Sequence, residues 1–194
     1  MKESSSEVTH YNKKFENIVY ADKHIVNRFF DTCTFYKSAL QNCLFDGCTF
    51  ENCIFEECDL SLIKLKDTAF KGAHFNNCKA IGIHWFDAEN PLTIHFNRSN
   101  ISYSSFFGKN LKKAQFVGCH ALEVDFTECN LTQANFKDTE LAGAKFSTTD
   151  LTQANFVGAT NYYINPQINK VKKAKFKLPE ALVFLQSLEI IIEE

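Results

Sequence analysis

A large apolar residue occupies every fifth position over most of this 194-residue chain, and that spacing limits the possible folds more than any other feature. Neither an α-helix, with about 3.6 residues per turn, nor a plain strand, whose side chains alternate, keeps every fifth residue on one face. The fold must therefore contain another kind of repeating turn. The series begins at Phe15, shifts by one residue between Phe75 and Phe96, and ends at Phe156.

The residues between the large positions indicate the shape of each unit. Two positions before a large residue the chain mostly has a compact side chain, such as Cys53, Ala114 or Ala134. Residues two apart in extended backbone share a face, so the compact and the large side chain both point inward. Two adjacent outward residues follow and require a bend. Each five-residue unit is thus a short straight piece and a corner.

A longer repeat shows how many corners complete one turn. The sequence Thr-Gln-Ala-Asn-Phe at 132–136 recurs unchanged at 152–156, 20 residues later. Four units therefore form one turn, and equivalent residues of successive turns lie in columns. This predicts an all-β solenoid, a four-sided rod whose neighbouring turns pair as parallel strands. The predicted core stack is the column Phe35, Phe55, Phe75, Phe96, Phe116, Phe136 and Phe156.

The period divides the chain into three parts. Residues 1–14 precede it and are predicted to be an N-terminal tail, and residues 15–160 are predicted to form the rod. The period weakens within residues 79–95, where the shift predicts a one-residue bulge. Two interpretations of that stretch remain open. An exposed Trp85 would bind a partner, whereas a buried Trp85 would fill a distorted turn, and the second is favoured.

Residues 161–194 lack the period and are predicted to be a C-terminal cap and dimerisation segment. A helix is expected over Pro179–Ser187, because proline suits the first helical turn and Glu180 suits its positive end. Three isoleucines then predict a short strand. The segment could cap the open end of the rod alone, but we expect it to pair with a second copy in a homodimer. The candidate dimer interface is Leu182, Leu185, Leu188, Ile190, Ile191 and Ile192.

All eight cysteines occupy the compact inward position. The four from Cys43 to Cys58 are five residues apart, so they lie on successive sides of the rod and do not converge on one zinc ion. We interpret them as core residues. Cys33 and Cys53, and likewise Cys58 and Cys78, are expected one turn apart, close enough in principle for a disulfide. The first residues are polar and no apolar run reaches membrane length, so we expect a cytoplasmic protein with reduced thiols.

The net charge is only −2, but the charges are unevenly distributed. Residues 31–60 carry a net charge of −5, residues 61–120 carry +5, and residues 121–160 carry −4. Acidic and basic bands therefore alternate along the rod, and no nucleic-acid groove is indicated. The acidic bands contain the candidate partner-binding residues Glu51, Glu56, Glu57, Asp59, Glu123, Asp125 and Glu128.

No catalytic or cofactor-binding pattern is present in the sequence. The six histidines lack metal-ligand spacing, no glycine-rich phosphate loop follows a strand, and the outward acids are too evenly dispersed to select a catalytic pair. We therefore expect a protein that is not an enzyme, with no metal and no cofactor.

Two of the repeats resemble a known consensus. The sequences Ala-Asn-Phe-Lys-Asp at 134–138 and Ala-Asn-Phe-Val-Gly at 154–158 are similar to the pentapeptide repeat: a small residue, Asp or Asn, Leu or Phe, and two variable residues. The resemblance extends over roughly residues 30–158. It implies a right-handed quadrilateral parallel β-helix, here with a short C-terminal helix and strand.

Within that family, the rod followed by Ile164-Asn165-Pro166, a helix and an apolar strand resembles the Qnr and McbG type. That resemblance implies a bacterial cytosolic homodimer that binds DNA gyrase or topoisomerase IV and protects it from quinolones or a peptide toxin. The implied mechanism is DNA mimicry, because a rod of DNA-like width and negative surface would meet the lysines and arginines that normally contact phosphates. The alternative is a structural or scaffolding module with an unrelated partner, bound through Trp85 and Phe86.

Overall fold

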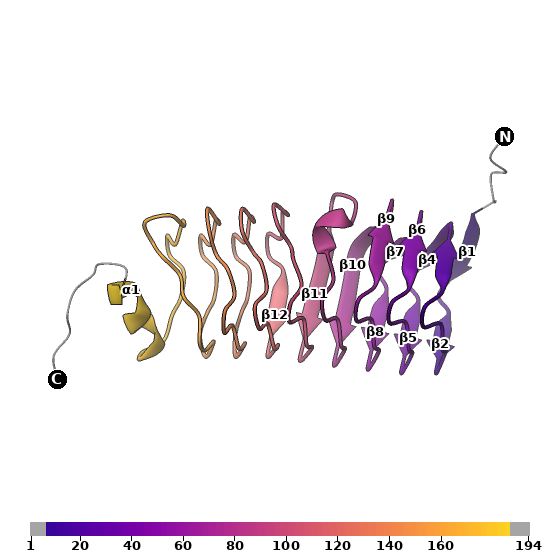
Figure 1. The fold of residues 1–194 in the computed structure, drawn as a ribbon, viewed down its shortest axis with the longest axis horizontal. Helices are drawn as coiled ribbons and strands as arrows, with labels where there is room; N and C mark the ends of the chain where they lie inside the picture. Colours follow the sequence, from indigo (N-terminus) through magenta and orange to yellow (C-terminus); the bar gives the residue numbers. More distant parts are fainter. Residues whose placement is uncertain (1–6, 187–194) are drawn as a thin grey trace.

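The protein is a single rod of stacked rectangular turns, seen in a computed structural model that describes residues 7–186 (Figure 1). The N-terminal turns lie at one end of the rod and the C-terminal helix at the other. All strand pairs are parallel, and each residue pairs with its equivalent in the next turn, as Phe35 does with Phe55. The structure confirms the predicted right-handed quadrilateral β-helix. Of the C-terminal elements, the expected strand lies outside the described residues.

The strands are short because each side of the rod is only one five-residue unit long. One sheet has the order β1-β4-β7-β10-β8-β5-β2, with β11 and β12 continuing from β10, and a second has the order β3-β6-β9. After β12, single bridges such as Asn135 with Asn155 continue the same parallel pairing. The strands are β1 Val8–Tyr11, β2 Lys14–Glu16, β3 His24–Val26, β4 Arg28–Asp31, β5 Thr34–Tyr36, β6 Leu44–Asp46, β7 Thr49–Glu51, β8 Ile54–Glu56, β9 Lys64–Lys66, β10 Ala69–Asn76, β11 Thr93–Asn97 and β12 Gln115–Val117.

The corners require a left-handed backbone conformation at nearly every unit. Asn52, Glu57, Leu62 and Asp67 all have φ between 48° and 59°, and they lie one unit apart. Asparagine and aspartate adopt this conformation more readily than most residues. One left-handed residue per unit therefore produces the bend that two adjacent outward positions require.

Aromatic rings fill the rod in two kinds of contact. Within a column the rings stack, as Phe35 does on Phe55 with centroids 4.7 Å apart and planes 7° apart. Between columns they meet edge to face, as Phe116 meets Phe126 at 5.4 Å and 73°. Both arrangements are favourable for the ring quadrupole. All seven residues of the predicted core stack are buried, and each stacks on its neighbour in the column.

One turn departs from the regular register. Asp59 pairs with Lys79 as a regular turn requires, but Lys71 pairs with Thr93, two positions later than in a regular turn. Ala73 pairs with Ile94, only one position later. The turn that contains the 3-10 helix η1 (Trp85–Asp87) is therefore enlarged, and the irregularity between Lys71 and Ala73 removes one of the two extra residues. The net offset is the predicted single residue.

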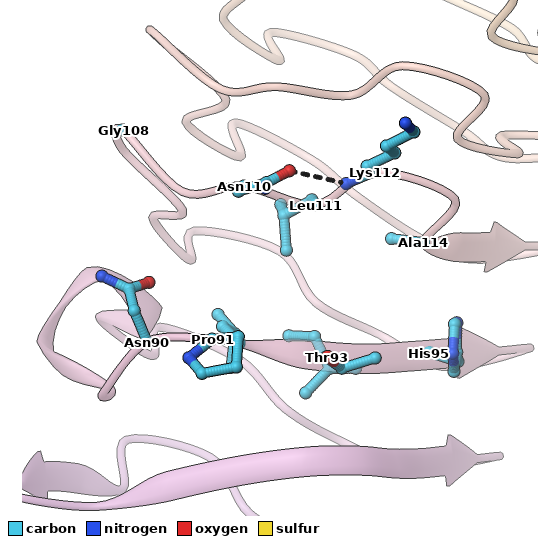
Figure 2. A pocket seen from close by; sticks show the side chains of 11 residues that line it. Asn90, Pro91, Thr93, His95, Gly108, Asn110, Leu111, Lys112 and Ala114 are labelled. Carbon is cyan, nitrogen blue, oxygen red and sulfur yellow. Dashed lines mark hydrogen bonds between the residues drawn. The ribbon is translucent and has the colours of Figure 1, made fainter.

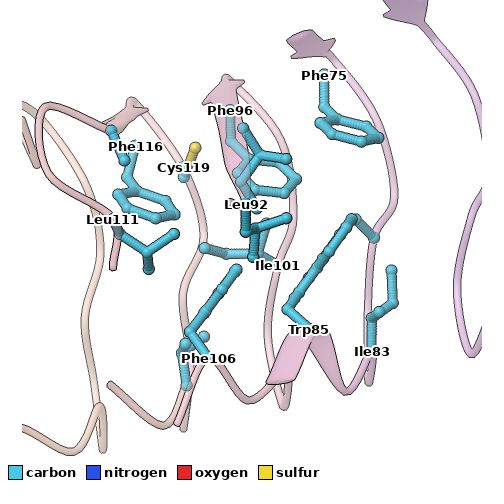
Figure 3. Close-up of a cluster of buried hydrophobic side chains, with 14 of the residues drawn as sticks. Phe75, Ile83, Trp85, Leu92, Phe96, Ile101, Phe106, Leu111, Phe116 and Cys119 are labelled. Atoms are coloured by element: carbon cyan, nitrogen blue, oxygen red, sulfur yellow. The ribbon is translucent and has the colours of Figure 1, made fainter. Parts of the chain in front are cut away.

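Trp85 fills this enlarged turn. Its side chain is fully buried, its ring lies edge-on to Phe75 and Phe96 at 5.6 Å, and it stacks on Phe106 at 5.9 Å (Figure 3). Of the two interpretations, the favoured one agrees with the structure, and binding of a partner through an exposed Trp85 does not. Its neighbour Phe86 is exposed.

The coil begins within residues 1–14, earlier than an N-terminal tail over that whole stretch would allow. Strand β1 already pairs with β4, and His10 is the register partner of Phe30. The sequence pattern does not reveal this first turn, because a histidine occupies the position of the large apolar residue. Its ring stacks on Phe30 with centroids 5.0 Å apart and lies edge-on to Phe15.

Replacing His10 with phenylalanine should stabilise the rod most at mildly acidic pH. Burial, together with the charges of Lys13 and Arg28, lowers the pKa of His10 below 6.5. The unfolded chain then binds the proton more readily, so stability falls as pH decreases from 6.5 through the lowered pKa of the folded state. Phenylalanine removes this proton uptake and the unpartnered Nδ1, with an expected gain of roughly 1 kcal/mol.

Urea unfolding of both proteins from about pH 5 to pH 8 measures this effect, because that interval spans the titration of histidine. Lys14→Phe is the matched control, since its exposed side chain lies in the neighbouring strand β2. An equal pH dependence in wild type and His10→Phe would contradict the role of His10.

At the other end, the coil continues beyond residue 160. Lys170 and Lys175 still bridge to the preceding turn, and Phe176 stacks on Phe156 at 5.2 Å. The expected helix over Pro179–Ser187 appears as a 3-10 turn, η2 (Glu180–Leu182), followed by α1 (Val183–Gln186). Phe184 lies edge-on to Phe176 at 4.6 Å and covers part of the end of the rod.

Candidate functional site

The inward-facing cysteines provide no site for chemistry at the surface. All eight are buried free thiols, and seven donate hydrogen bonds to backbone carbonyls of the preceding turn. Burial raises the pKa of Cys53, Cys119 and Cys129 to about 12, so these thiols stay protonated. No group of three or more His, Cys, Asp or Glu that could hold a metal ion occurs within residues 7–186. The cysteines therefore act as compact core residues.

The seven predicted partner-binding acids all reach the outer surface of the rod but do not form one face. Glu51, Glu56 and Asp59 belong to successive five-residue units and lie on successive sides. Asp125 and Glu128 share one unit, and Glu123 lies at the corner before it. Glu57, Glu123 and Glu128 are exposed, whereas the other four are half-buried. The structure thus groups the acids locally around two regions of the rod.

Lysines of neighbouring turns lie beside many of the acids. Glu51 is the register partner of Lys71, and the backbone of Asp125 forms a parallel β-bridge with that of Lys145 in the next turn. Other pairs make direct contact, since Lys66 Nζ lies 3.0 Å from Asp46 Oδ2 and lowers the pKa of that carboxyl group. Further ion pairs join Lys37 to Glu57, at 3.6 Å, and Lys170 to Asp150, at 3.4 Å. The outer surface is therefore a mosaic of both signs rather than a continuous negative stripe.

Two exposed aromatic residues lie on the enlarged turn and the turn after it. Phe86 is 41% exposed and Phe107 is 45% exposed, and they follow the stacked pair Trp85 and Phe106. The ring of His84 stacks on Phe86 at 5.2 Å. We call His84, Phe86 and Phe107 the aromatic strip. Phe107 is not among the residues predicted from the sequence, although a phenylalanine directly after the large inward Phe106 is a possible signal.

A hollow of about 520 Å³ lies beside the enlarged turn. Figure 2 shows Asn90 and Pro91 on one side of it and Asn110, Leu111 and Lys112 on the other. Asn110 uses its Oδ1 to accept a hydrogen bond from the backbone N–H of Lys112, which holds this corner together. We assign no ligand to it.

Lys109 anchors the loop above this hollow. It occupies a compact inward position and is only 6% exposed, and its Nζ donates hydrogen bonds to Ala88 O at 2.6 Å and to Asn90 Oδ1 at 3.4 Å. Burial lowers the pKa of this amine. The enlarged turn makes the room that a lysine needs in a position otherwise filled by residues such as Cys129.

Replacing Lys109 with alanine should destabilise the protein by about 1–3 kcal/mol, because the buried carbonyl of Ala88 loses its hydrogen-bond donor. Urea unfolding measures the loss. The control is Lys112→Ala in the same turn, whose exposed side chain should matter by less than about 0.5 kcal/mol. Equal effects of the two substitutions would show that Lys109 is not an anchor.

Two protein-family models match the repeat region of this chain. A model described as "Pentapeptide repeat region" matches residues 29–106, and a model described as "Pentapeptide repeats (8 copies)" matches residues 110–147 and 129–160. The chain belongs to the pentapeptide-repeat family. No curated protein sequence matches this family member.

Solved structures of pentapeptide-repeat proteins share the fold along the rod. QnrB1, a plasmid-mediated fluoroquinolone resistance protein, superposes with a TM-score of 0.73 at 15% identity, covering 97% of this chain and 99% of that one. HetL from the cyanobacterium Nostoc, a protein involved in regulating heterocyst differentiation, superposes with a TM-score of 0.57 at 14% identity, covering 89% and 88%. At such low identity the likeness shows the fold alone, which is that of a Qnr-like pentapeptide-repeat protein.

Among the described residues of this pentapeptide-repeat protein, no helix is long and apolar enough to cross a bilayer.

Proposed function

We propose that this pentapeptide-repeat protein is a non-catalytic interaction rod that binds DNA gyrase or topoisomerase IV in the cytoplasm and protects it from quinolones or a toxin. The observation that carries the proposal is the end-to-end likeness to QnrB1, which extends over 97% of the chain. Rigid faces built from stacked turns suit recognition of a large partner, since solenoids offer extended binding surfaces.

The proposed contact uses the acids in two local groups. Glu51 to Asp59 lie near the N-terminal third of the rod, and Glu123 to Glu128 lie nearer its C-terminal end. A topoisomerase saddle rich in lysine and arginine would meet these carboxylates in place of phosphates. The lysines beside many acids make partial DNA mimicry by separate acidic patches a better description than a continuous negative surface.

A gyrase supercoiling assay with the full chain tests the proposal. Relaxed plasmid, gyrase and ciprofloxacin are combined with increasing protein, and restored supercoiling is expected. Neither protection nor inhibition over a wide concentration range, for gyrase and for topoisomerase IV, would overturn it.

Charge variants locate the contact within the same assay. Glu123→Gln with Glu128→Gln should weaken protection and reduce its salt dependence, because charge at an interface rim mainly steers association. The matched control is Asp150→Asn, whose carboxylate is already within 3.4 Å of Lys170 Nζ. If the control weakens protection as much as the double variant, the acidic patch at Glu123 and Glu128 is not the contact.

We propose further that the protein acts as a homodimer formed through its C-terminal ends. Leu182 is 49% exposed in η2 and Leu185 is half-buried in α1, so both have surface left to pair. The other proposed interface residues, Leu188 and Ile190 to Ile192, lie outside the described residues. Sedimentation should give a dimer at micromolar concentration and a monomer after removal of residues 178–194. A monomeric full chain, or an unchanged dimer after truncation, would refute this assembly.

The aromatic strip favours a second candidate, a scaffolding module with another protein partner. Exposed aromatic side chains in a cluster are typical of protein-binding surfaces. Affinity capture from a native lysate separates the candidates, because only the first predicts topoisomerase subunits among the captured proteins. The variant Phe86→Ser with Phe107→Ser should abolish capture under the second candidate and leave supercoiling protection intact under the first.

A further inference from the structure

One corner of the C-terminal half of the rod is lined by lysines. Lys113 and Lys173 occupy this corner three turns apart, with Gln133 and Gln153 in the two turns between, and all four have the left-handed corner conformation. Backbone hydrogen bonds link the corner from each turn to the next. Because neighbouring turns lie about 4.8 Å apart, roughly 14 Å along the rod separates Lys113 from Lys173.

The outward residues on either side of this corner carry further lysines. We call the corner and these residues the lysine edge, which consists of Lys112, Thr132, Thr152 and Lys172, then Lys113, Gln133, Gln153 and Lys173, then Gln115, Asn135, Asn155 and Lys175. It contains five lysines and no acid, and all five lysines are exposed. Asp138 and Asp150, on the same two sides of the rod, are already paired with Lys137 at 3.7 Å and Lys170 at 3.4 Å. The lysine edge therefore presents positive charge that no residue of the edge balances.

Amide side chains between the lysines are held in fixed positions. Asn135 Nδ2 donates a hydrogen bond to Gln115 Oε1 at 2.9 Å, and Asn155 Nδ2 donates one to Asn135 Oδ1 at 3.0 Å. At the corner itself, Gln133 Nε2 donates to Gln153 Oε1 at 2.7 Å. An amide nitrogen carries two N–H donors and each of these bonds uses one of them. The ladder therefore offers further donors to an acceptor that lies along the edge.

These groups match the backbone of a nucleic acid duplex. Lysine and the amides of asparagine and glutamine are common donors to phosphate oxygens. The separation of Lys113 from Lys173 is similar to the width of the major groove, about 12 Å, so the two ends of the edge can reach phosphates of both strands. The edge has no aromatic side chain for stacking on unpaired bases and no large apolar side chain for insertion into a membrane.

We propose that the lysine edge binds the sugar–phosphate backbone of duplex DNA without sequence preference. The sequence did not indicate a nucleic-acid surface, because these lysines are three turns apart in the chain and only the coil brings them to one corner. The acids Glu123 and Asp125 lie on other sides of the rod, so both surfaces can be occupied at the same time. The inference does not depend on the proposed topoisomerase partner.

Fluorescence anisotropy of a labelled duplex of mixed sequence, titrated with the full chain at several salt concentrations, tests this surface. Binding should weaken steadily with salt, with a slope of log K against log salt of about −4 to −5 if all five lysines contact phosphates. Duplexes of unrelated sequence should bind equally, because backbone contacts carry no sequence information. No binding at low salt would overturn the proposal.

Paired glutamine variants locate the contact. Lys113→Gln with Lys173→Gln should lower the affinity on the order of 10- to 100-fold at about 0.1 M salt and make the slope shallower by about 2. Glutamine fits this corner, since Gln133 and Gln153 already occupy it. The matched control is Lys79→Gln with Lys145→Gln, which removes the same charge from two exposed lysines on other sides of the rod and should change the affinity much less.

Circular dichroism checks that both pairs of variants keep the fold. An equal loss of affinity in the two pairs would overturn the assignment to the lysine edge. Tighter binding to single-stranded DNA, or to vesicles that contain phosphatidylserine, than to the duplex would also overturn it. Either result leaves the topoisomerase proposal standing, because the variants of Glu123 and Glu128 test that contact separately.

Discussion

Replacing Phe116 with alanine is expected to lower the free energy of unfolding by about 3–5 kcal/mol. Phe116 is fully buried at the centre of the rod, in strand β12. Its ring stacks on Phe136 at 5.0 Å and on Phe96 at 5.8 Å, and it lies edge-on to Phe126 at 5.4 Å. Alanine leaves a cavity that stacked turns cannot close, because each turn is held in place by hydrogen bonds to the turns on both sides.

Urea unfolding followed by circular dichroism measures this loss. The control is Phe107→Ala, which removes the same side chain from an outward position that is 45% exposed. It should cost much less, because little apolar area leaves the core. A loss below about 1 kcal/mol for Phe116→Ala would contradict its place in the column.

Replacing Trp85 with alanine is expected to cost a similar amount, about 3–5 kcal/mol, and to disturb the enlarged turn. The indole ring contacts Phe70, Phe75, Phe96 and Phe106 at centroid distances of 5.3–5.9 Å. It lies in the column that Phe106 continues in the next turn. Loss of the ring therefore affects both neighbouring turns.

Trp85→Phe is the informative companion. The indole Nε1 is buried and has no hydrogen-bond partner within the described structure, so its removal recovers part of the cost of the lost volume. Phenylalanine should therefore cost far less than alanine. Circular dichroism must follow unfolding here, because Trp85 is the only tryptophan and both variants lack its fluorescence. Equal losses for alanine and phenylalanine would show that ring packing at this position contributes little.

The regular part of the rod was predictable because the inward positions are set by local spacing. The column from Phe35 to Phe156 follows from counting in fives, and the structure buries every member. Counting in fives fails where an unexpected residue type occupies an inward position. The start of the coil was not recognised because His10, a polar residue, occupies an inward position that usually has a large apolar side chain. Lys109 occupies an inward position that usually has a compact side chain, and its Nζ binds the carbonyl of Ala88.

The candidate site was predictable only as a set of outward acids. The sequence places Glu51 and Asp125 outside, but it does not say which residue lies beside them in the next turn. The structure sets Lys71 beside Glu51 and Lys145 beside Asp125, and so divides the acidic bands into separate patches. Phe107 lies one turn after Phe86, and the local pattern does not show that the two are on neighbouring turns.

The solenoid, its four sides and the inward direction of the stacked phenylalanines and the cysteines follow from the sequence alone, because each five-residue unit specifies its own bend and its own inward pair. Which side chains lie next to each other across turns follows only from the tertiary structure, as for the ion pair of Lys66 with Asp46 and the packing of Trp85 against Phe96 and Phe106. Those neighbours are separated by a full turn of the chain, so the local five-residue pattern does not specify which side chains meet.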